Sequence, residues 1–222
     1  MELITTILEW VLHLDTHLAQ IIQQFGGWTY GILFFVIFME TGFVVTPFLP
    51  GDSLLFAAGA LAASTGAFDM VFLFVLMFIA AFAGDSVNYW IGHIVGPKAF
   101  TGTSKLFKKE YLERTQAFYE KHGGKTILLA RFIPIIRTFA PFVAGIGKMR
   151  YGYFITYNIV GGFLWTGLFL FGGYFFGNLP FVSDNFSFVV IAIILISLIP
   201  AVVEVLRNRK PAVKIESETP IE

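Results

Sequence analysis

Three long apolar runs dominate the pattern of hydrophobic and polar positions along the chain. They cover residues 70–96, 153–177 and 186–206, and each contains very few charged residues. About 20 helical residues, rising roughly 1.5 Å each, are needed to cross a hydrocarbon core of ~30 Å. The three runs are therefore predicted transmembrane helices. The pattern indicates an all-α polytopic membrane protein.

Two further apolar stretches, residues 28–66 and 125–148, are interrupted before they reach that length. Proline removes a backbone donor, and irregular backbone at membrane depth persists only where protein or a wet cavity covers it. We therefore predict that each stretch is a re-entrant helical hairpin. The alternative for the first is that residues 28–46 form an ordinary span followed by a loop. The predicted hairpin breaks are Pro47, Pro50, Gly51, Pro134 and Pro141.

Basic residues are unevenly distributed, although the 15 basic and 15 acidic residues balance formally. Seven of the basic residues lie within residues 98–125 and four more within 207–214. Short flanks rich in Lys and Arg remain in the cytoplasm, so the amphipathic segment 98–124 and the C-terminus are predicted to be cytoplasmic. The first hairpin then enters from the non-cytoplasmic side and the second from the cytoplasmic side. A zero net charge does not indicate nucleic acid as a partner.

The remaining segments complete a predicted domain plan. Residues 1–24 have apolar positions at helical spacing and are predicted to form an amphipathic interfacial helix. Residues 25–207 form one membrane domain, and the polar tail 208–222 is predicted to be disordered. In each hairpin a proline precedes an Ala-Gly pair, and a span with a Gly-x-x-x-Gly pair follows. We predict an inverted repeat, which in transporters places the binding site at the repeat interface.

Four charged residues lie inside the predicted hairpins: Glu40 and Asp52 in the first, Arg131 and Arg137 in the second. A charge at the centre of a bilayer costs roughly 3 kcal/mol even on a lenient scale, so such residues usually have a function. The arginine fork suits a phosphate or a carboxylate. A carboxylate in a low-dielectric site can take up a proton. We predict that the four side chains meet near the midplane, the arginines to bind substrate and the acids to form ion pairs and exchange protons.

Simpler roles remain open for these residues. Two acids and two arginines can pair with each other in a purely structural way, and Asp52 can cap the helix that follows it. Asp85, in the span 70–96, is a secondary candidate for a proton path, with a polar contact between helices as the alternative.

Catalysis and metal binding receive little support from the sequence. No histidine lies near the hairpin charges, no metal ligands cluster, and cysteine is absent. We therefore predict no catalytic residues, no metal and no cofactor, which makes a membrane enzyme such as a lipid phosphatase or an intramembrane protease the less favoured class.

Four motifs give the chain a resemblance to a known family. They are Phe38-x-Glu40, the string from Pro47 to Leu55, Gly84-Asp85-x-x-x-Tyr89-x-x-Gly92, and the string from Gly124 to Pro141. They resemble the DedA family of bacterial inner-membrane proteins, within the SNARE-associated or VTT-domain superfamily. The resemblance extends from residue 1 to about residue 207 and is close to the DedA subgroup itself.

The resemblance implies a function that spacing alone does not. It implies a multi-pass inner-membrane flippase that translocates a lipid phosphate, foremost undecaprenyl phosphate recycled for envelope synthesis, and that depends on the proton motive force. Its partners would be membrane lipids, a polyprenyl phosphate among them, and protons. The positions the family requires match Glu40, Asp52, Arg131 and Arg137. A cation/proton antiporter and a general phospholipid scramblase are the alternatives.

Overall fold

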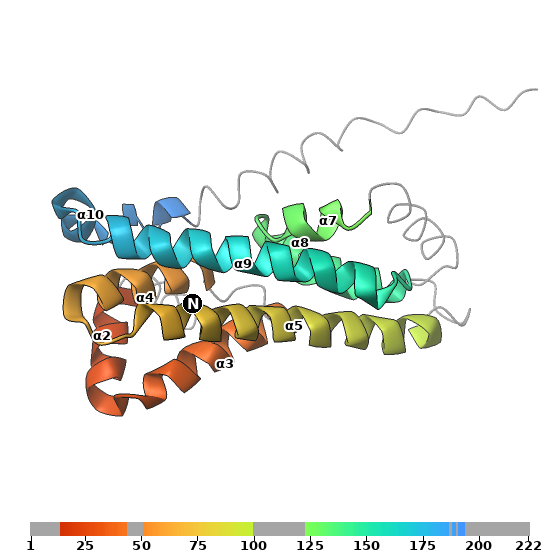
Figure 1. The fold of residues 1–222 in the computed structure, drawn as a ribbon, viewed down its shortest axis with the longest axis horizontal. Helices are drawn as coiled ribbons and strands as arrows, with labels where there is room; N and C mark the ends of the chain where they lie inside the picture. The colour runs from red at the N-terminus through yellow and green to blue at the C-terminus, as the bar shows by residue number, and fades with distance from the viewer. Residues whose placement is uncertain (1–13, 44–50, 100–122, 187, 190, 194–222) are drawn as a thin grey trace, which may run out of the picture.

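The computed structural model describes residues 14–43, 51–99, 123–186, 188–189 and 191–193 of the chain. Every secondary-structure element within these ranges is a helix, which confirms the all-α prediction for this part of the chain. The helices shown in Figure 1 are α2 (Leu14–Phe25), α3 (Trp28–Gly42), α4 (Gly51–Thr65), α5 (Met70–Ala99), α7 (Lys125–Ala130), α8 (Pro134–Ile146), α9 (Tyr151–Phe176) and α10 (Pro180–Asp184).

Helices α5 and α9 are long enough to cross a membrane, and they lie side by side along the long axis of the molecule (Figure 1). The apolar stretches Met70–Val95 and Tyr151–Phe176 each contain 26 residues. Such a helix extends roughly 39 Å, more than a hydrocarbon core of ~30 Å. These stretches correspond to the predicted spans 70–96 and 153–177.

Several predicted segments lie wholly or largely outside the described residues. They are the third span, the basic segment 98–124 and the C-terminal tail. Of the predicted N-terminal helix, only α2 is described, and it packs against α3 and α4. The chain reverses between α2 and α3 at Gly26, whose φ of +53° lies in the left-handed region that glycine adopts without strain.

Helices α3 and α4 are each 15 residues long. A helix of that length extends only about 22 Å, which is less than the thickness of the hydrocarbon core. Helix α3 ends at Gly42, before the predicted break, and Gly51 is the first residue of α4; Pro47 and Pro50 lie outside the described residues. Both helices are therefore too short to cross the core, and the re-entrant insertion of this hairpin stays a prediction.

In the second hairpin, Pro134 lies at a break between helices and Pro141 does not. Pro134 is the first residue of α8 and follows Ile133, whose backbone is extended, as the residue before a proline usually is. Pro141 was predicted to interrupt the hairpin, but it lies inside the continuous α8, so that prediction was wrong. A proline within a helix removes one hydrogen bond of the ladder, and α8, which packs against α5, continues through it.

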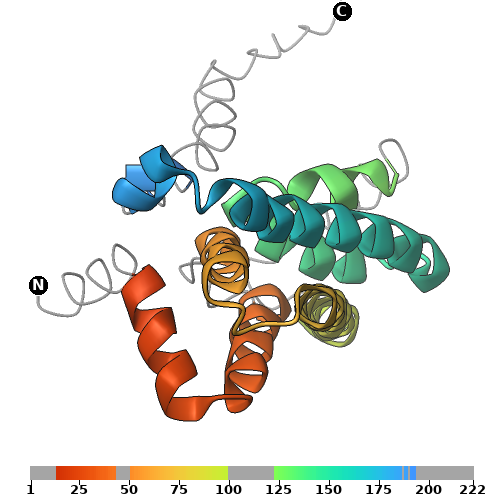
Figure 2. The same ribbon diagram turned by 60° about the vertical axis from the view of Figure 1, so that its left-hand side comes forward.

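Helix α4 lies in the centre of the molecule, between α9, α3 and α2 (Figure 2). Eleven of its 15 residues are buried. Its side chains between Leu54 and Ala62 are apolar or absent on all faces, the composition expected of a helix surrounded by protein. The first turn of α4 is therefore held deep inside the molecule, which places the charged residue there away from the surface.

Glycines allow α4 to approach the backbone of α9 closely. A Cβ atom on Gly59 would lie 2.0 Å from the carbonyl oxygen of Leu170, and a Cβ atom on Gly173 would lie 1.9 Å from that of Phe56. Each glycine thus faces the residue three positions before the other glycine. A larger side chain at either position would force the two helices apart.

The same reciprocal contact joins α8 to α5. A Cβ atom on Gly145 would lie 2.0 Å from the carbonyl oxygen of Tyr89, and one on Gly92 would lie 2.1 Å from that of Phe142. Again each glycine faces the residue three positions before its counterpart. The short helix of each hairpin therefore packs in the same manner against the long helix of the other half, as an internal repeat requires. The inverted insertion of the two halves stays a prediction.

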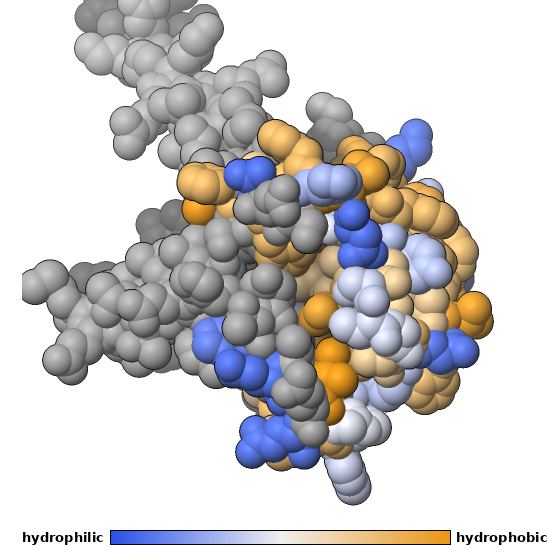
Figure 3. Space-filling model, turned by 90° about the vertical axis from the view of Figure 1, so that its left-hand side faces the viewer, coloured by the Kyte–Doolittle hydropathy of each residue, from blue (hydrophilic) through white to orange (hydrophobic). Residues whose placement is uncertain are grey.

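The long helices also expose large apolar side chains on their outer faces. Examples are Phe72 and Val75 on α5 and Phe163 and Leu168 on α9, each between 45% and 59% exposed. Many exposed apolar side chains on neighbouring helices indicate contact with lipid or with another protein. Figure 3 views one end of the molecule, where hydrophilic and hydrophobic surface lie next to each other.

Candidate functional site

Arg137 of α8 lies between the two acids of the first hairpin. Its Nη1 donates to Oδ1 of Asp52 at 2.6 Å, and its Nη2 forms an ion pair with Oε1 of Glu40. All three side chains are buried. The structure thus brings together three of the four charged residues predicted from the hairpins. We call these three residues the Arg137 group.

The position of Glu40 depends on the helix ends around it. Glu40 lies near the C-terminus of α3, and its Oε1 accepts the backbone N–H of Gly51 at 3.3 Å. Gly51 begins α4, and the N-terminus of a helix favours a negative charge. A Cβ atom on Gly51 would lie 1.8 Å from Oε2 of Glu40. Glycine is therefore required at this position for the carboxylate to reach both the helix N-terminus and Arg137.

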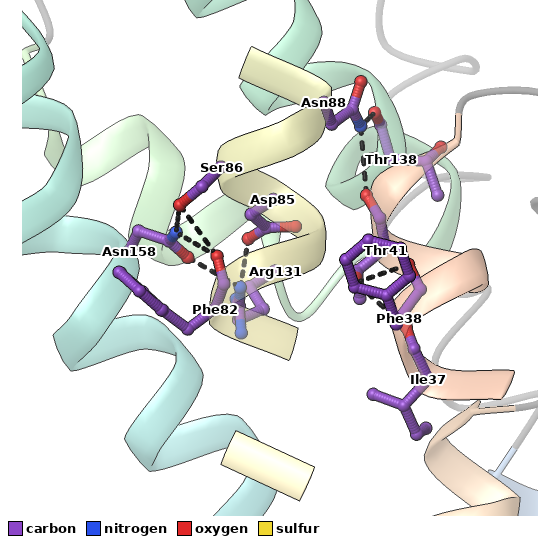
Figure 4. A network of polar contacts seen from close by, with 10 residues as sticks. All are labelled: Ile37, Phe38, Thr41, Phe82, Asp85, Ser86, Asn88, Arg131, Thr138 and Asn158. Carbon is purple, nitrogen blue, oxygen red and sulfur yellow. Dashed lines mark hydrogen bonds and ion pairs between the residues drawn. The ribbon is translucent and has the colours of Figure 1, made fainter. Parts of the chain in front are cut away.

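Arg131 is held by different partners from those of Arg137. It follows the last residue of α7, and its Nη2 forms an ion pair with Oδ2 of Asp85 and donates to Oδ1 of Asn158 at 2.8 Å. Figure 4 shows Arg131 between α5, which carries Asp85, and α9, which carries Asn158. The amide nitrogen of Asn158 donates to the carbonyl oxygen of Phe82 at 3.1 Å, which orients its oxygen toward the guanidinium. We call Asp85, Arg131 and Asn158 the Arg131 group.

The pairing differs from the sequence prediction in one respect. The acids of the first hairpin were expected to face both arginines, but both of them pair with Arg137. Asp85, predicted as a secondary candidate with a contact between helices as its alternative role, is the acid that pairs with Arg131. Asn158 was not predicted, although an amide in an otherwise apolar span is a detectable signal.

Asn88 connects the helices that carry these groups. Its side-chain amide nitrogen donates to the carbonyl oxygen of Thr41 in α3 at 3.1 Å and to that of Thr138 in α8 at 2.7 Å. Figure 4 shows it on the side of α5 that faces α3. Thr41 is in the last turn of α3, where helix carbonyls have no partner in the helix itself. Asn88 therefore fixes the end of α3, one residue from Glu40, relative to the helix of Arg137.

Trp165 of α9 contacts both groups. Its indole N–H donates to Oδ1 of Asp52 at 2.8 Å, and its ring centroid lies 4.9 Å from the guanidinium carbon of Arg137 and 5.8 Å from that of Arg131. Both distances are within the range of cation–π attraction. Trp165 was not predicted from the sequence, because a tryptophan in an apolar span is common and carries no charge.

The two groups together contain three carboxylates and two guanidinium groups, a formal charge of −1 when all are ionised. Several of their buried polar atoms have no hydrogen-bond partner within the described residues. A buried polar atom without a partner costs about 1–3 kcal/mol, and more for a charged group. The site therefore has both donor and acceptor capacity for an anion and a proton. The unpartnered atoms are Oε2 of Glu40, Oδ1 of Asp85, Nη1 of Arg131 and Nε of Arg137.

Within the described ranges, no three His, Asp or Glu side chains are arranged to hold a metal ion. The arrangement of the site is instead that of a buried ion-pair network built around two arginines.

Comparison with known proteins places the chain among membrane proteins. The family model of the VTT domain matches residues 49–175, a range that includes every residue of the site except Glu40. Protein DedA of Escherichia coli strain K12 is 52% identical over 216 residues, covering 96% of this chain and 99% of that protein. An uncharacterized membrane protein of Mycobacterium leprae is 44% identical over 76% of this chain and 75% of its own length. Inner membrane protein YqjA of Escherichia coli strain K12 is 33% identical over 81% of each chain. No solved structure gave a significant match.

Proposed function

Because the chain belongs to the DedA family of VTT-domain membrane proteins, we propose that it is a transporter that translocates a lipid phosphate across the bacterial inner membrane. The names of its relatives support the membrane assignment and state no catalytic activity. The proposal accordingly includes no chemical reaction. Undecaprenyl phosphate, recycled for envelope synthesis, is the substrate that we propose.

The observation that carries the proposal is the pair of buried arginines, each held by carboxylates. A guanidinium group offers parallel N–H donors that match the oxygens of a phosphate as well as those of a carboxylate. Glu40, Asp52 and Asp85 occupy the positions that a phosphate would take. The carboxylates keep both arginines paired until a headgroup replaces them. Exchange of partners is less costly than exposing an unpaired charge in the bilayer.

Proton dependence follows from the balance of charges. The ionised site already carries a net charge of −1. An incoming phosphate adds further negative charge, which a low-dielectric interior disfavours. Protonation of Glu40 or Asp52 removes one competitor for Arg137 and lets the phosphate bind. A proton gradient would then favour loading on the more acidic side of the membrane. The lipid tail would remain in the bilayer, against the exposed apolar faces of α5 and α9.

A reconstituted translocation assay tests the proposal. The protein is placed in liposomes with a fluorescent polyprenyl phosphate or a fluorescent phosphatidylcholine, and transbilayer movement is followed by quenching of the outer leaflet, with and without a pH gradient. We expect the polyprenyl phosphate to move faster than the phosphatidylcholine, at a rate that depends on the pH gradient. An Arg131→Gln, Arg137→Gln double variant should lose this movement. The exposed Arg150→Gln variant is the matched control.

The same assay separates the alternatives. Equal movement of both lipids without a gradient dependence would indicate a scramblase. Proton flux in the same liposomes, measured with an enclosed pH-sensitive dye, that requires a cation and no lipid phosphate would indicate an antiporter. Normal movement of the phosphate lipid in the double arginine variant would refute the proposed site.

A further inference from the structure

Trp165 shares a single carboxylate oxygen with an arginine. Oδ1 of Asp52 accepts both the indole N–H, at 2.8 Å, and Nη1 of Arg137, at 2.6 Å. Trp165 is completely buried, and a buried tryptophan usually finds a partner for its N–H. Here the partner is a charged group of the site. The indole therefore holds the Asp52 carboxylate in the position in which it meets Arg137.

The helix that carries Trp165 also supports the other arginine. Asn158, Gly161, Gly162 and Trp165 are spaced so that they share one face of α9. A Cβ atom on Gly162 would lie 2.9 Å from Nη1 of Arg131, and one on Gly161 would lie 3.6 Å from its Cδ. The Arg131 side chain thus lies across the two glycines, between the amide of Asn158 and the ring of Trp165.

A single aromatic ring therefore contacts both ion-paired groups. We propose that Trp165 is a positioning residue of the lipid phosphate site: it keeps Asp52 on Arg137 and couples the two guanidinium groups, so that a headgroup displaces their partners together. The proposal rests on the transport function proposed above. Movement of α9 would break the contacts of Trp165 with Asp52 and of Asn158 with Arg131 in the same step.

A role in packing alone predicts a different outcome. Phenylalanine fills most of the same volume and keeps a π face for the cations, but it has no N–H to donate. Leucine has neither a π face nor an N–H donor. The positioning role therefore predicts a loss in the Trp165→Phe variant, whereas simple packing predicts little change in that variant.

Fluorescence tests the contact itself, independently of transport. In full-length protein with Trp10, Trp28 and Trp90 changed to Phe, Trp165 is the remaining tryptophan of the sequence. Excitation moves electron density away from the indole nitrogen, so a negative charge beside that nitrogen lowers the emission energy. We expect Asp52→Asn to shift the emission by several nanometres to shorter wavelength. The control is Asp69→Asn, which removes an exposed acid. Equal emission shifts in Asp52→Asn and Asp69→Asn would refute the contact between Trp165 and Asp52.

Transport tests the consequence of that contact. We expect Trp165→Phe to lower the initial rate of polyprenyl phosphate movement about tenfold, the effect expected of one hydrogen bond to a charged group. Trp165→Leu should lower it further, and Trp90→Phe, at a half-exposed tryptophan, should stay within about twofold of the wild type. Thermal unfolding of each variant identifies a folding defect. A wild-type rate in a folded Trp165→Phe variant would refute the positioning role.

The two tests also separate this inference from the proposed function. If the wild-type protein moves no phosphate lipid, the transport function fails, and with it the assignment of Trp165 to a lipid phosphate site. The emission shift would still show whether Trp165 positions Asp52 within the ion-pair network.

Discussion

Replacing Gly51 by alanine tests whether the first hairpin is built around the Glu40 carboxylate. The new Cβ atom would lie 1.8 Å from Oε2 and 2.6 Å from Cδ of Glu40, far inside van der Waals contact. The carboxylate is the end of a flexible side chain and can move. Because it is buried and bound to both Arg137 and the Gly51 N–H, any movement weakens these two contacts.

The expected magnitude follows from the ion pair. Removing one partner of a buried pair destabilises a protein by about 3–5 kcal/mol, and displacing it keeps part of the attraction, so we expect Gly51→Ala to lower the free energy of unfolding by about 2–4 kcal/mol. Gly31→Ala is the matched control, since a Cβ atom on Gly31 of α3 would meet no atom within 4 Å. That change should be neutral or stabilising by up to ~1 kcal/mol.

The assay is reversible unfolding in mixed micelles, performed as a double-mutant cycle. In a Glu40→Ala background no carboxylate remains for the new methyl group to displace, so Gly51→Ala should then destabilise the protein by less than about 1 kcal/mol. Two results would refute the reasoning. One is the same destabilisation by Gly51→Ala in both backgrounds, and the other is a stability of Gly51→Ala equal to that of Gly31→Ala.

Other contacts lead to further predictions. Gly59→Ala should destabilise the protein by about 1–3 kcal/mol because its methyl group meets the backbone of α9, whereas Gly167→Ala, whose methyl group makes ordinary contacts, should be neutral in the same unfolding assay. Asn88→Ala removes two buried hydrogen bonds to backbone carbonyls and should destabilise by about 2–4 kcal/mol, with faster hydrogen exchange at the end of α3. Asp85→Asn leaves Arg131 without a carboxylate and should destabilise by about 3–5 kcal/mol, while the exposed Asp69→Asn should change stability by less than about 1 kcal/mol; equal effects of the two would contradict the ion pair.

The sequence by itself identified the charged residues that lie within the apolar runs. In a soluble domain Glu40, Asp52, Arg131 and Arg137 would be four charges among many. In this chain the surrounding runs are apolar, and a charge in such a run is costly enough to indicate a function. Length likewise predicted the helices α5 and α9, because a membrane requires a minimum number of helical residues. Each of these spans ends in a pair of glycines, and one glycine of each pair, Gly92 and Gly173, lies at a close helix contact.

Only the tertiary structure decided which charges pair. Arg131 meets Asp85 across 46 positions of sequence, and Arg137 meets Glu40 across 97, since helix crossings set these distances and local patterns do not. The crossings depend on glycine contacts whose partner helix the sequence does not specify. Pro141 lies inside α8 although proline removes one backbone bond of a helix, and α8 packs closely against α5 at Gly92 and Gly145. Trp165 could not be selected from the sequence, since an uncharged aromatic residue in an apolar run acquires a role only from the groups that the fold places around it.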